Sequence, residues 1–389
     1  AEDVIRDGPQ CLVGSEMCIR DRHHPTNLST STMKQFEVRK NDLSAFRVTE
    51  QDTPGIEDGE ILAAVERFAF TANNISYAVV GEKLGYWNFF PVEEGWGVIP
   101  VWGFARVTKS KHPEVNVGER LYGYWPMATH LVMQPGRLRS DQVRDMSAHR
   151  AELPAVYNSY ARASGEAHYD PSMDDERMLL MPLYATSYCL YDFLVANKFF
   201  GASQVIVPSA SSKTAIGLAY ALRDDPDAPP CVGITSATNR ERVSAIGLYD
   251  KVLGYDDLQE IDSDRPTVIV DMSGNGSVLS ELHRHLGVNM RFTSNVGLTH
   301  YDAGQMGPDF IRERSSMFFA PEHIRKRGEQ WGPGEFQKRA YAFWHSSAIR
   351  SRDWLNIEHC HGVACVQGVF ERVRDGEVSP DTGLVVTLS

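Results

Sequence analysis

The sequence predicts an α/β protein in which a small β-barrel domain precedes a doubly wound parallel sheet. Residues 59–135 contain short strands broken by glycine and proline at regular spacing, which is typical of small barrels and sandwiches. From Leu179 onward, short β-branched apolar runs alternate with helical segments, which indicates βαβ units. At 389 residues, the chain is long enough for two domains, because single cores stop growing near about 250–300 residues.

The composition is that of a folded, acidic protein. Apolar residues make up 42% of the chain and charged residues 23%, which argues against disorder. The formal net charge of -12 argues against a nucleic acid or an anionic membrane as partner, because both require a basic surface. The best candidate for a membrane span, residues 185–200, is interrupted by Asp192 and Lys198. We therefore expect a cytoplasmic protein with a small-molecule substrate, and a homodimer is a compatible assembly.

The first 32 residues differ in character from the rest. Residues 11–22 (CLVGSEMCIRDR) resemble translated sequencing-adapter read-through, and the stretch lacks the basic start and apolar run of a signal peptide. We expect the native start at Met33, where residues 34–38 begin to alternate like a strand.

The predicted strands of the first domain are short and regularly spaced. They are residues 61–68, 103–109, 120–125 and 130–133. From residue 135 to 175 the chain is polar and irregular, with weak helical signals near residues 145–151.

The predicted elements of the second domain alternate between strand and helix. Strands are expected at residues 204–207, 231–235, 251–253, 267–270 and 289–293, and helices at residues 185–198, 213–223, 240–246 and 277–286. Right-handed crossovers then favour a doubly wound nucleotide-binding sheet. After residue 297 the chain is helical and charged to residue 350, and a helix at 363–372 precedes a strand at 383–388.

This order of elements resembles the medium-chain dehydrogenase/reductase superfamily, most closely its uncharacterised branch DUF2855, a domain of unknown function. Residues 59–65 (GEILAAV) resemble the opening strand of the superfamily's chaperonin-10-like (GroES-like) barrel, and residues 115–123 (VNVGERLYG) resemble its turn-plus-strand signature. Residues 233–255 resemble the second and third strands of its Rossmann domain. We accordingly divide the chain into a leader at 1–32, a GroES-like catalytic domain at 33–165, a Rossmann domain at 166–345, and a segment at 346–389 that returns to the catalytic domain.

A serine-rich loop follows the predicted strand at residues 204–207. With Gly217 placed as the third glycine of the family's G-x-G-x-x-G, Ser212 and Thr214 replace the two glycines that let the backbone approach a pyrophosphate. Hydroxyl donors, an exposed lysine and a helix N-terminus are expected to compensate by attracting anions. A serine-rich turn that only caps a helix is the alternative. The cofactor-binding residues predicted here are Ser209, Ser211, Ser212, Lys213, Thr214 and Gly217.

The end of the second strand of this domain favours NADP(H) as the cofactor. An NAD-specific site carries an acid there, whereas Thr235 and Ser236 stand at this position, with Arg240 close behind. An arginine suits the 2′-phosphate because it can donate two hydrogen bonds to it. The alternative for Arg240 is a solvated residue that opens a helix.

The sequence lacks the zinc ligands of the zinc alcohol dehydrogenases. No cysteine occurs between Met33 and Tyr188, and the family's Gly-His-Glu turn appears as residues 99–103 (IPVWG). No metal is expected, although the run His359, Cys360 and His361 with Cys365 is metal-like. The four cysteines after Met33 are expected to be buried thiols: Cys189, Cys231, Cys360 and Cys365.

The predicted catalytic residues are Asn74, Tyr77 and Tyr86. Residues 71–77 (TANNISY) stand where zinc-free quinone and enoyl reductases carry an Asn-Pro-x-Asp turn. The resemblance implies that Asn74 binds the nicotinamide ribose or the substrate, and that Tyr77 or Tyr86 donates a proton to an enolate. For Tyr86, the lining of an apolar pocket is the alternative.

The remaining predicted cofactor contacts lie around the cleft between the domains. Thr186 and Tyr188 resemble the family's Thr-Ala-Tyr, which packs on the cofactor, and Ser273, Gly274 and Gly297 follow strands whose carboxyl ends face the cleft. Together the residues predict a zinc-independent, NADPH-dependent reductase of an activated C=C or C=O bond. The alternative is a non-catalytic NADP(H)-binding protein, a sensor or structural relative on the same fold.

Overall fold

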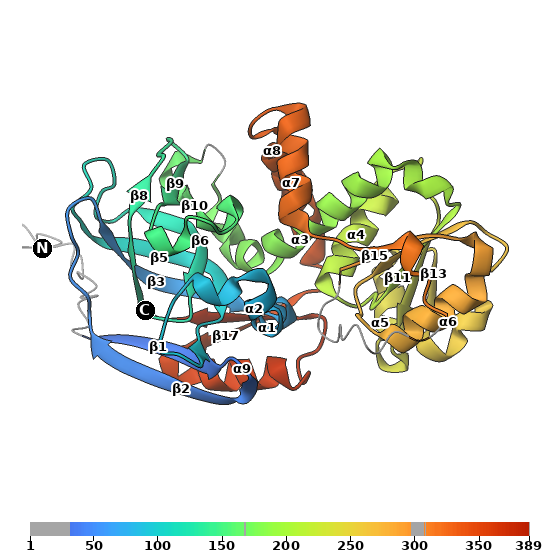
Figure 1. The fold of residues 1–389 in the computed structure, drawn as a ribbon, viewed down its shortest axis with the longest axis horizontal. Helices are drawn as coiled ribbons and strands as arrows, with labels where there is room; N and C mark the ends of the chain where they lie inside the picture. The colour runs from blue at the N-terminus through green and yellow to red at the C-terminus, as the bar shows by residue number, and fades with distance from the viewer. Residues whose placement is uncertain (1–31, 167–168, 297–306, 308, 389) are drawn as a thin grey trace, which may run out of the picture.

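The protein is described by a computed structural model that covers residues 32–166, 169–296, 307 and 309–388. Two lobes lie side by side, one built mainly of strands and one of alternating strands and helices (Figure 1). The predicted leader, apart from Thr32, and the predicted cofactor residue Gly297 lie outside the described residues.

The first lobe is made of two mainly antiparallel sheets. Its core sheet contains the four predicted strands, observed at β3 (Ile61–Phe70), β5 (Pro100–Ser110), β6 (Arg120–Pro126) and β7 (His130–Met133), which confirms them. Shorter strands complete this sheet: β8 (Pro135–Gly136), β9 (Gln142–Asp145) and β10 (Ser159–Arg162). The second sheet has the order β2–β1–β4, from β1 (Thr32–Arg39), β2 (Asp42–Asp52) and β4 (Trp96–Gly97). Strand β2 was not predicted, because it is polar and largely exposed and lacks a clear apolar face.

The second lobe contains a six-stranded parallel sheet with helices around it. Its strand order is β13–β12–β11–β14–β15–β16, so the order reverses between β11 and β14. In such a sheet, ligands bind at this reversal, outside the carboxyl ends of the strands. The strands are β11 (Gln204–Pro208), β12 (Cys231–Thr235), β13 (Lys251–Gly254), β14 (Thr267–Asp271), β15 (Met290–Asn295) and β16 (Ser315–Met317). The helices between them are α4 (Lys213–Asp224), α5 (Ala237–Ile246) and α6 (Gly276–Leu286).

Helix α3 (Asp174–Ala196) joins the two lobes and contacts both of them (Figure 1). It begins well before the predicted start at residue 185, because Pro182 lies inside the helix instead of ending it. Among the described residues, the stretch Pro171–Ala196 is the one helix long and apolar enough to span a membrane. Since 56% of that window is buried within the chain, α3 is the core helix between the lobes.

A helical hairpin rises beside α3. It consists of α7 (Ala320–Trp331) and α8 (Glu335–Ser351), which agrees with the helical character predicted for this part of the chain (Figure 1). Asp192 of α3 binds two side chains of α7: its Oδ2 lies 2.6 Å from His323 Nε2 and 2.5 Å from Arg327 Nε. The hairpin is therefore anchored to the helix between the lobes by buried polar contacts as well as by apolar packing.

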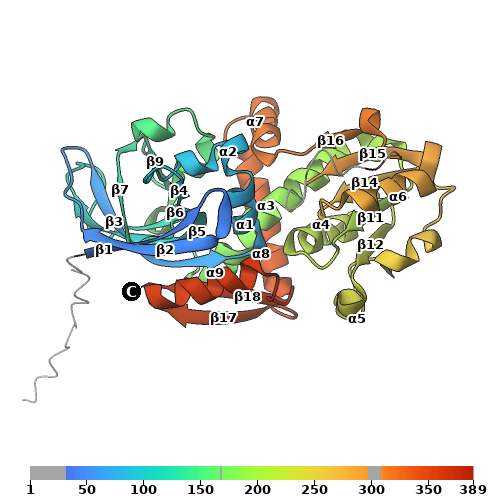
Figure 2. The same ribbon diagram turned by 60° about the horizontal axis from the view of Figure 1, so that its bottom comes forward.

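The end of the chain returns to the first lobe (Figure 2). Strand β17 (Asn356–His361) and strand β18 (Thr382–Thr387) pair in parallel, and helix α9 (Val366–Arg374) connects them. Strand β18 also pairs antiparallel with β3 and so extends the core sheet of the first lobe. The predicted final helix and strand are confirmed, whereas β17 was missed because its side chains are mostly polar and exposed.

The cysteine prediction is wrong for two of the four residues. Cys360 and Cys365 form a disulfide, because the turn from β17 into α9 brings their Cα atoms to 6.1 Å. Cys189 and Cys231 are free and buried, as expected.

Candidate functional site

The serine-rich loop between β11 and α4 is held in shape by its own hydrogen bonds. Ser209 has a φ of 61°, a left-handed conformation that is unusual for a residue with a side chain, and its backbone N–H donates to Tyr255 Oη. Ser212 is the N-cap of α4, and its Oγ accepts from the Ala215 N–H at 3.3 Å. The Thr214 carbonyl accepts a hydrogen bond from Ser187 Oγ of α3 at 2.7 Å. Ser212 therefore performs the capping role that was the alternative interpretation of this loop.

The sequence predicted an exposed Lys213 at the start of the helix. In the structure, its side chain is instead held by the C-terminal segment. Its Nζ donates to the carbonyls of Pro380 and Thr382, at 2.9 and 2.7 Å, in the segment that leads into β18. Burial lowers the pKa of Lys213 to about 8, although Asp381 nearby acts in the opposite direction. The ammonium thus ties the loop to the C-terminal segment, a partner different from the predicted pyrophosphate.

Gly217 allows α4 to pack closely on α3. A Cβ at this position would lie 2.6 Å from Tyr184 Cδ1 and even closer to Ser187 Oγ, and both of these residues belong to α3. This is the close-packing role that the third glycine plays in the dinucleotide-binding fingerprint, here between two helices.

The end of β12 carries the residues predicted to select NADP(H). Ser236 stands at the N-cap of α5, where its hydroxyl lies 2.9 Å from Thr238 Oγ1. Arg240 is exposed and forms an ion pair with Asp257 at 2.7 Å. Asp257 was missed by the sequence analysis, because it follows the third strand of the sheet, 17 residues after Arg240. The only signal for it was the acidic pair that follows Tyr255.

At the carboxyl end of β14, Asp271 organises the turn that contains Ser273 and Gly274. Its carboxylate accepts from the Ser273 N–H and Oγ at 2.9 and 2.6 Å and from the Gly274 N–H at 3.0 Å. Burial raises the pKa of Asp271. This turn lies beside the strand reversal, and Asp271 is a further residue that the sequence analysis did not single out.

Asn74 caps helix α1 (Ala72–Val79) from a buried position. Its Oδ1 accepts from the Thr71 N–H at 2.8 Å, and its Nδ2 donates to the Pro100 carbonyl at 2.9 Å. Both ends of the amide therefore have partners within the first lobe. The same helix presents its neighbour Asn73, which was not predicted, towards Tyr77.

The two candidate tyrosines have different surroundings. The oxygen of Tyr77 accepts hydrogen bonds from Asn73 Nδ2 at 2.8 Å and from Trp102 Nε1 at 3.3 Å, and burial raises the pKa of this phenol. Tyr86 packs against Tyr77, with ring centroids 4.7 Å apart, and its hydroxyl lies 3.0 Å from that of Tyr157. Tyr86 thus belongs to an aromatic cluster with Tyr77 and Tyr157.

A small cavity lies where α1 and β5 of the first lobe meet α3. Its volume is about 10 Å³, which is enough for roughly one water molecule. It is lined by residues of the first lobe and of α3: Ala69, Thr71, Asn73, Asn74, Trp102, Met178, Leu179, Pro182 and Leu183. Leu183 lies one helical turn before Ser187, which contacts Thr214 of the serine-rich loop. Helix α3 therefore contacts both the serine-rich loop and this cavity, whose lining includes Asn73 and Trp102, the hydrogen-bond partners of Tyr77.

Thr186 and Tyr188, the two residues of α3 that were predicted to contact the cofactor, have other partners. The Thr186 hydroxyl donates to the Pro182 carbonyl at 3.2 Å, within the same helix. Tyr188 packs on Phe336 and Phe343 of α8, with ring centroids 5.5 and 5.7 Å away. The residue of this stretch that meets the serine-rich loop is Ser187, which sequence reasoning passed over.

A larger, charged cavity lies on the core sheet of the first lobe. Its volume is about 270 Å³, and its lining includes three arginines together with Glu66 and Thr387. The arginines are paired with acids of the chain itself: Arg106 and Arg120 with Glu66, and Arg67 with Asp174. Because these charges are already compensated, the smaller cavity beside α3 is the better candidate for chemistry. Within the described part of the chain, no group of three histidines, cysteines or acids could hold a metal ion.

The comparisons agree with the architecture. The family model described as "Protein of unknown function (DUF2855)" matches residues 68–379. No curated protein matches the sequence. Among solved structures, the chain is similar to CurA from Vibrio vulnificus, which has also been solved in complex with NADPH. The TM-score is 0.63 at 14% sequence identity, and the match covers 92% of this chain and 99% of CurA. The quinone oxidoreductase from Coxiella burnetii has a TM-score of 0.55 at 13% identity, with 92% and 100% covered. The fold is therefore that of the medium-chain dehydrogenase/reductase superfamily, with a GroES-like domain and a Rossmann domain.

Proposed function

Because the chain belongs to the DUF2855 family, whose function is unknown, we propose a function from its own fold and site. The protein is an NADPH-dependent, zinc-independent reductase of an activated C=C or C=O bond in a small molecule. The observation that carries this proposal is the position of α3, which contacts Thr214 through Ser187 and lines the cavity beside Tyr77 through Leu183. One helix thereby contacts both the proposed nucleotide-binding loop and the cavity that is lined by Asn73 and Trp102, the hydrogen-bond partners of Tyr77.

The residues around the serine-rich loop and the end of β12 fit a dinucleotide phosphate. The first N–H groups of a helix have no intrahelical partner, so the Lys213 and Thr214 amides at the start of α4 suit a pyrophosphate. The hydroxyls of Ser211 and Thr214 add donors. Ser236 and Arg240, at the start of α5, are the proposed contacts of the 2′-phosphate. When bound, NADPH supplies the hydride.

Tyr77 is the proton donor in this proposal. Its oxygen already accepts hydrogen bonds from Asn73 and Trp102, so its own proton remains available for an acceptor in the neighbouring cavity. A phenol is protonated at neutral pH, which is the form a general acid must have, and burial, which raises the pKa of Tyr77, keeps it in that form. The cavity holds about one water molecule, so substrate binding requires α1 and α3 to separate there.

A second candidate function is a non-catalytic NADP(H)-binding protein on the same fold. The small volume of the cavity favours it, as does the replacement of the first two fingerprint glycines by Ser212 and Thr214. A cytoplasmic location and a homodimer also remain predictions.

Tyr77→Phe is expected to lower substrate-stimulated NADPH oxidation at least about tenfold, since general acids contribute about 10²–10⁴-fold. The assay measures NADPH consumption with a panel of enones, quinones and aldehydes, with and without a chelator. The NADPH dissociation constant should not change. Tyr86→Phe is the matched control, because that hydroxyl pairs with Tyr157 behind Tyr77 and its loss should leave the rate nearly unchanged. An unchanged rate for Tyr77→Phe would refute the assignment, and a protein that binds NADPH but reduces nothing would favour the second candidate.

NADPH is expected to bind at least tenfold more tightly than NADH, a difference of about 1.4 kcal/mol that one arginine–phosphate contact can supply. Arg240→Ala should remove this preference. Asp257→Asn should strengthen NADPH binding, because it removes the carboxylate that now pairs with Arg240. Arg242→Ala is the control, since that side chain on the same helix contacts Ser379 and Asp381 instead. Titration of the four proteins by fluorescence measures the affinities, and equal affinities of the parent for both cofactors would contradict the prediction.

A further inference from the structure

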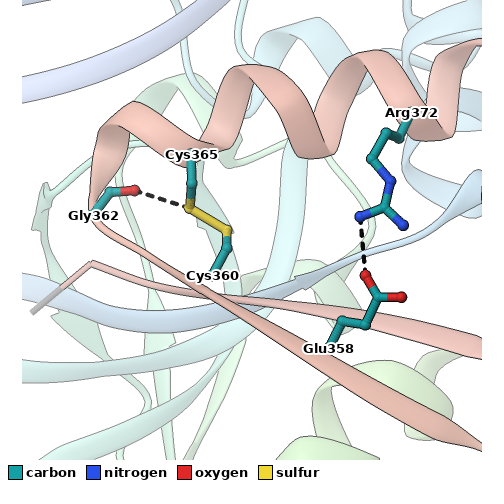
Figure 3. Close-up of a disulfide and its surroundings, with 5 residues drawn as sticks. All are labelled: Glu358, Cys360, Gly362, Cys365 and Arg372. Atoms are coloured by element: carbon teal, nitrogen blue, oxygen red, sulfur yellow. Dashed lines mark hydrogen bonds and ion pairs between the residues drawn. A yellow bond between two sulfur atoms is a disulfide. The ribbon is translucent and has the colours of Figure 1, made fainter.

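The disulfide between Cys360 and Cys365 ties an edge strand to the helix that follows it. Cys360 lies in β17, which pairs with β18 alone at the end of the core sheet, and Cys365 stands at the N-cap of α9. Figure 3 shows the bridge across the turn at Gly362, with the ion pair between Glu358 and Arg372 farther along the same strand and helix. The two elements are thus joined at two places.

The two sulfurs differ from the other described cysteines in their access to solvent. Cys360 and Cys365 are both partly exposed. Cys189 and Cys231 are buried, and burial raises the pKa of both of these thiols. Because thiol exchange requires a reachable sulfur and a thiolate, the bridged pair is the reactive one.

The fold around the bridge is stable for other reasons. Strand β17 pairs with β18 along all six of its residues. Helix α9 buries Val366, Val369 and Phe370 in the core of the first lobe, where the Phe370 ring packs on Phe36 at 5.2 Å. The disulfide closes a loop with only four residues between the cysteines, and short loops restrict the unfolded chain least. The native state therefore has little need of the bridge, so opening it leaves the fold intact.

We propose that Cys360 and Cys365 form a thiol–disulfide exchange site for low-molecular-weight thiols and their disulfides. Cys365 is the leaving sulfur, because the small thiol approaches from the edge strand that carries Cys360. Cys360, on the edge strand, is the sulfur that is attacked.

The reaction balances with two equivalents of the small thiol. Its thiolate bonds to Cys360 Sγ while the bond between the two protein sulfurs breaks, and the electron pair leaves on Cys365 Sγ, which takes a proton from water. A second thiolate then attacks the small-molecule sulfur of the mixed disulfide and releases Cys360 as a thiolate, which is protonated in turn. The protein disulfide is reduced by two electrons, and two thiols are oxidised to one small disulfide.

The test is a redox titration of the native full-length protein with reduced and oxidised glutathione. After alkylation and peptide mapping, Cys360 and Cys365 are expected to pass together between disulfide and dithiol at millimolar glutathione. Cys189 and Cys231 serve as internal controls and should be labelled only after denaturation. In the dithiol form, the amides of residues 360–365 should exchange at least about tenfold faster, while those of α9 after Val366 stay protected.

Two variants keep the proposal open to refutation. Cys365→Ser should accumulate a mixed disulfide with glutathione at Cys360, because the resolving thiol is missing, and a C360S/C365S double variant should acquire none at these positions. The double variant should keep the melting temperature of the parent within a few degrees. A bridge that is reduced only in denaturant, or a pair that stays reduced in oxidised glutathione, would overturn the proposal.

Discussion

Gly217→Ala is expected to be among the most destabilising single-methyl substitutions in the chain. The added Cβ would meet Ser187 Oγ and the Tyr184 ring, and both of these residues are fully buried. Overpacking costs about 1–3 kcal/mol and occasionally more, and contact with a rigid ring places this variant at the upper end of that range. The gain of about 1 kcal/mol in helix propensity from glycine to alanine is too small to offset it.

Urea denaturation of four proteins measures the effect: the parent, Gly217→Ala, Gly328→Ala and the double variant Ser187→Ala/Gly217→Ala. Gly328→Ala is the matched control, because Gly328 also lies inside a helix, α7, and a Cβ added there would meet no atom of a neighbouring element within 4 Å. That variant should be neutral or more stable by up to about 1 kcal/mol. Ser187→Ala should restore part of the loss in Gly217→Ala, since it removes the nearest atom but leaves the Tyr184 ring in place. Equal stabilities of Gly217→Ala and the parent would show that α3 and α4 do not pack as described.

Lys213→Met is expected to change how stability depends on pH. The pKa of Lys213 is lowered from 10.5 to about 8 in the folded protein, so between these pH values the unfolded chain binds more protons. The parent should therefore gain stability relative to Lys213→Met as pH rises from 8 to 10.5, by about 3 kcal/mol at 1.36 kcal/mol per pKa unit. At pH 7 the variant leaves the Pro380 and Thr382 carbonyls without a donor, a cost of about 1–3 kcal/mol that the removal of a desolvated charge partly offsets.

The measurement compares the unfolding free energies of the two proteins from pH 7 to pH 10.5. The difference between them isolates Lys213, because the titration of the tyrosines is common to both proteins. Lys251→Met is the control, since Lys251 is exposed and pairs with Glu260 at the surface, and its curve should run parallel to that of the parent. If the unfolding free energies of Lys213→Met and the parent also ran parallel with pH, the Lys213 ammonium would not be desolvated in the folded protein.

The parallel sheet was predictable because its strands are buried on both faces. Residues 204–208 and 267–271 are fully buried, and such strands appear in the sequence as short continuous apolar runs. The predicted starts of β11, β12, β13 and β14 coincide with the observed ones. The exposed strands β2 and β17 lack this signal, and Pro182 concealed the first half of α3.

The candidate site was less predictable, because its contacts join distant parts of the chain. Lys213 binds a carbonyl 169 residues away, and Ser187 binds one 27 residues away. The residue types of the loop predicted affinity for an anion, but nothing local indicated that the ammonium would be held by the C-terminal segment. In the same way, the hydrogen bonding of Tyr77 depends on Trp102, which is 25 residues away and reaches it only across the fold of the first lobe.

The pairing of β18 with β3 has a consequence for the order of events on the ribosome. Residues 384–387 attach β17 and β18 to a sheet whose remaining strands, from β3 to β10, are made more than 200 residues earlier. Until β18 is synthesised, the nascent first lobe exposes the edge of β3 that β18 later covers, and an open edge is prone to pairing with other chains. The parallel sheet, made of contiguous residues, can form first. A circular permutant that begins at Asn356 would supply β17 and β18 early, and it should give a higher soluble yield at the same rate of translation.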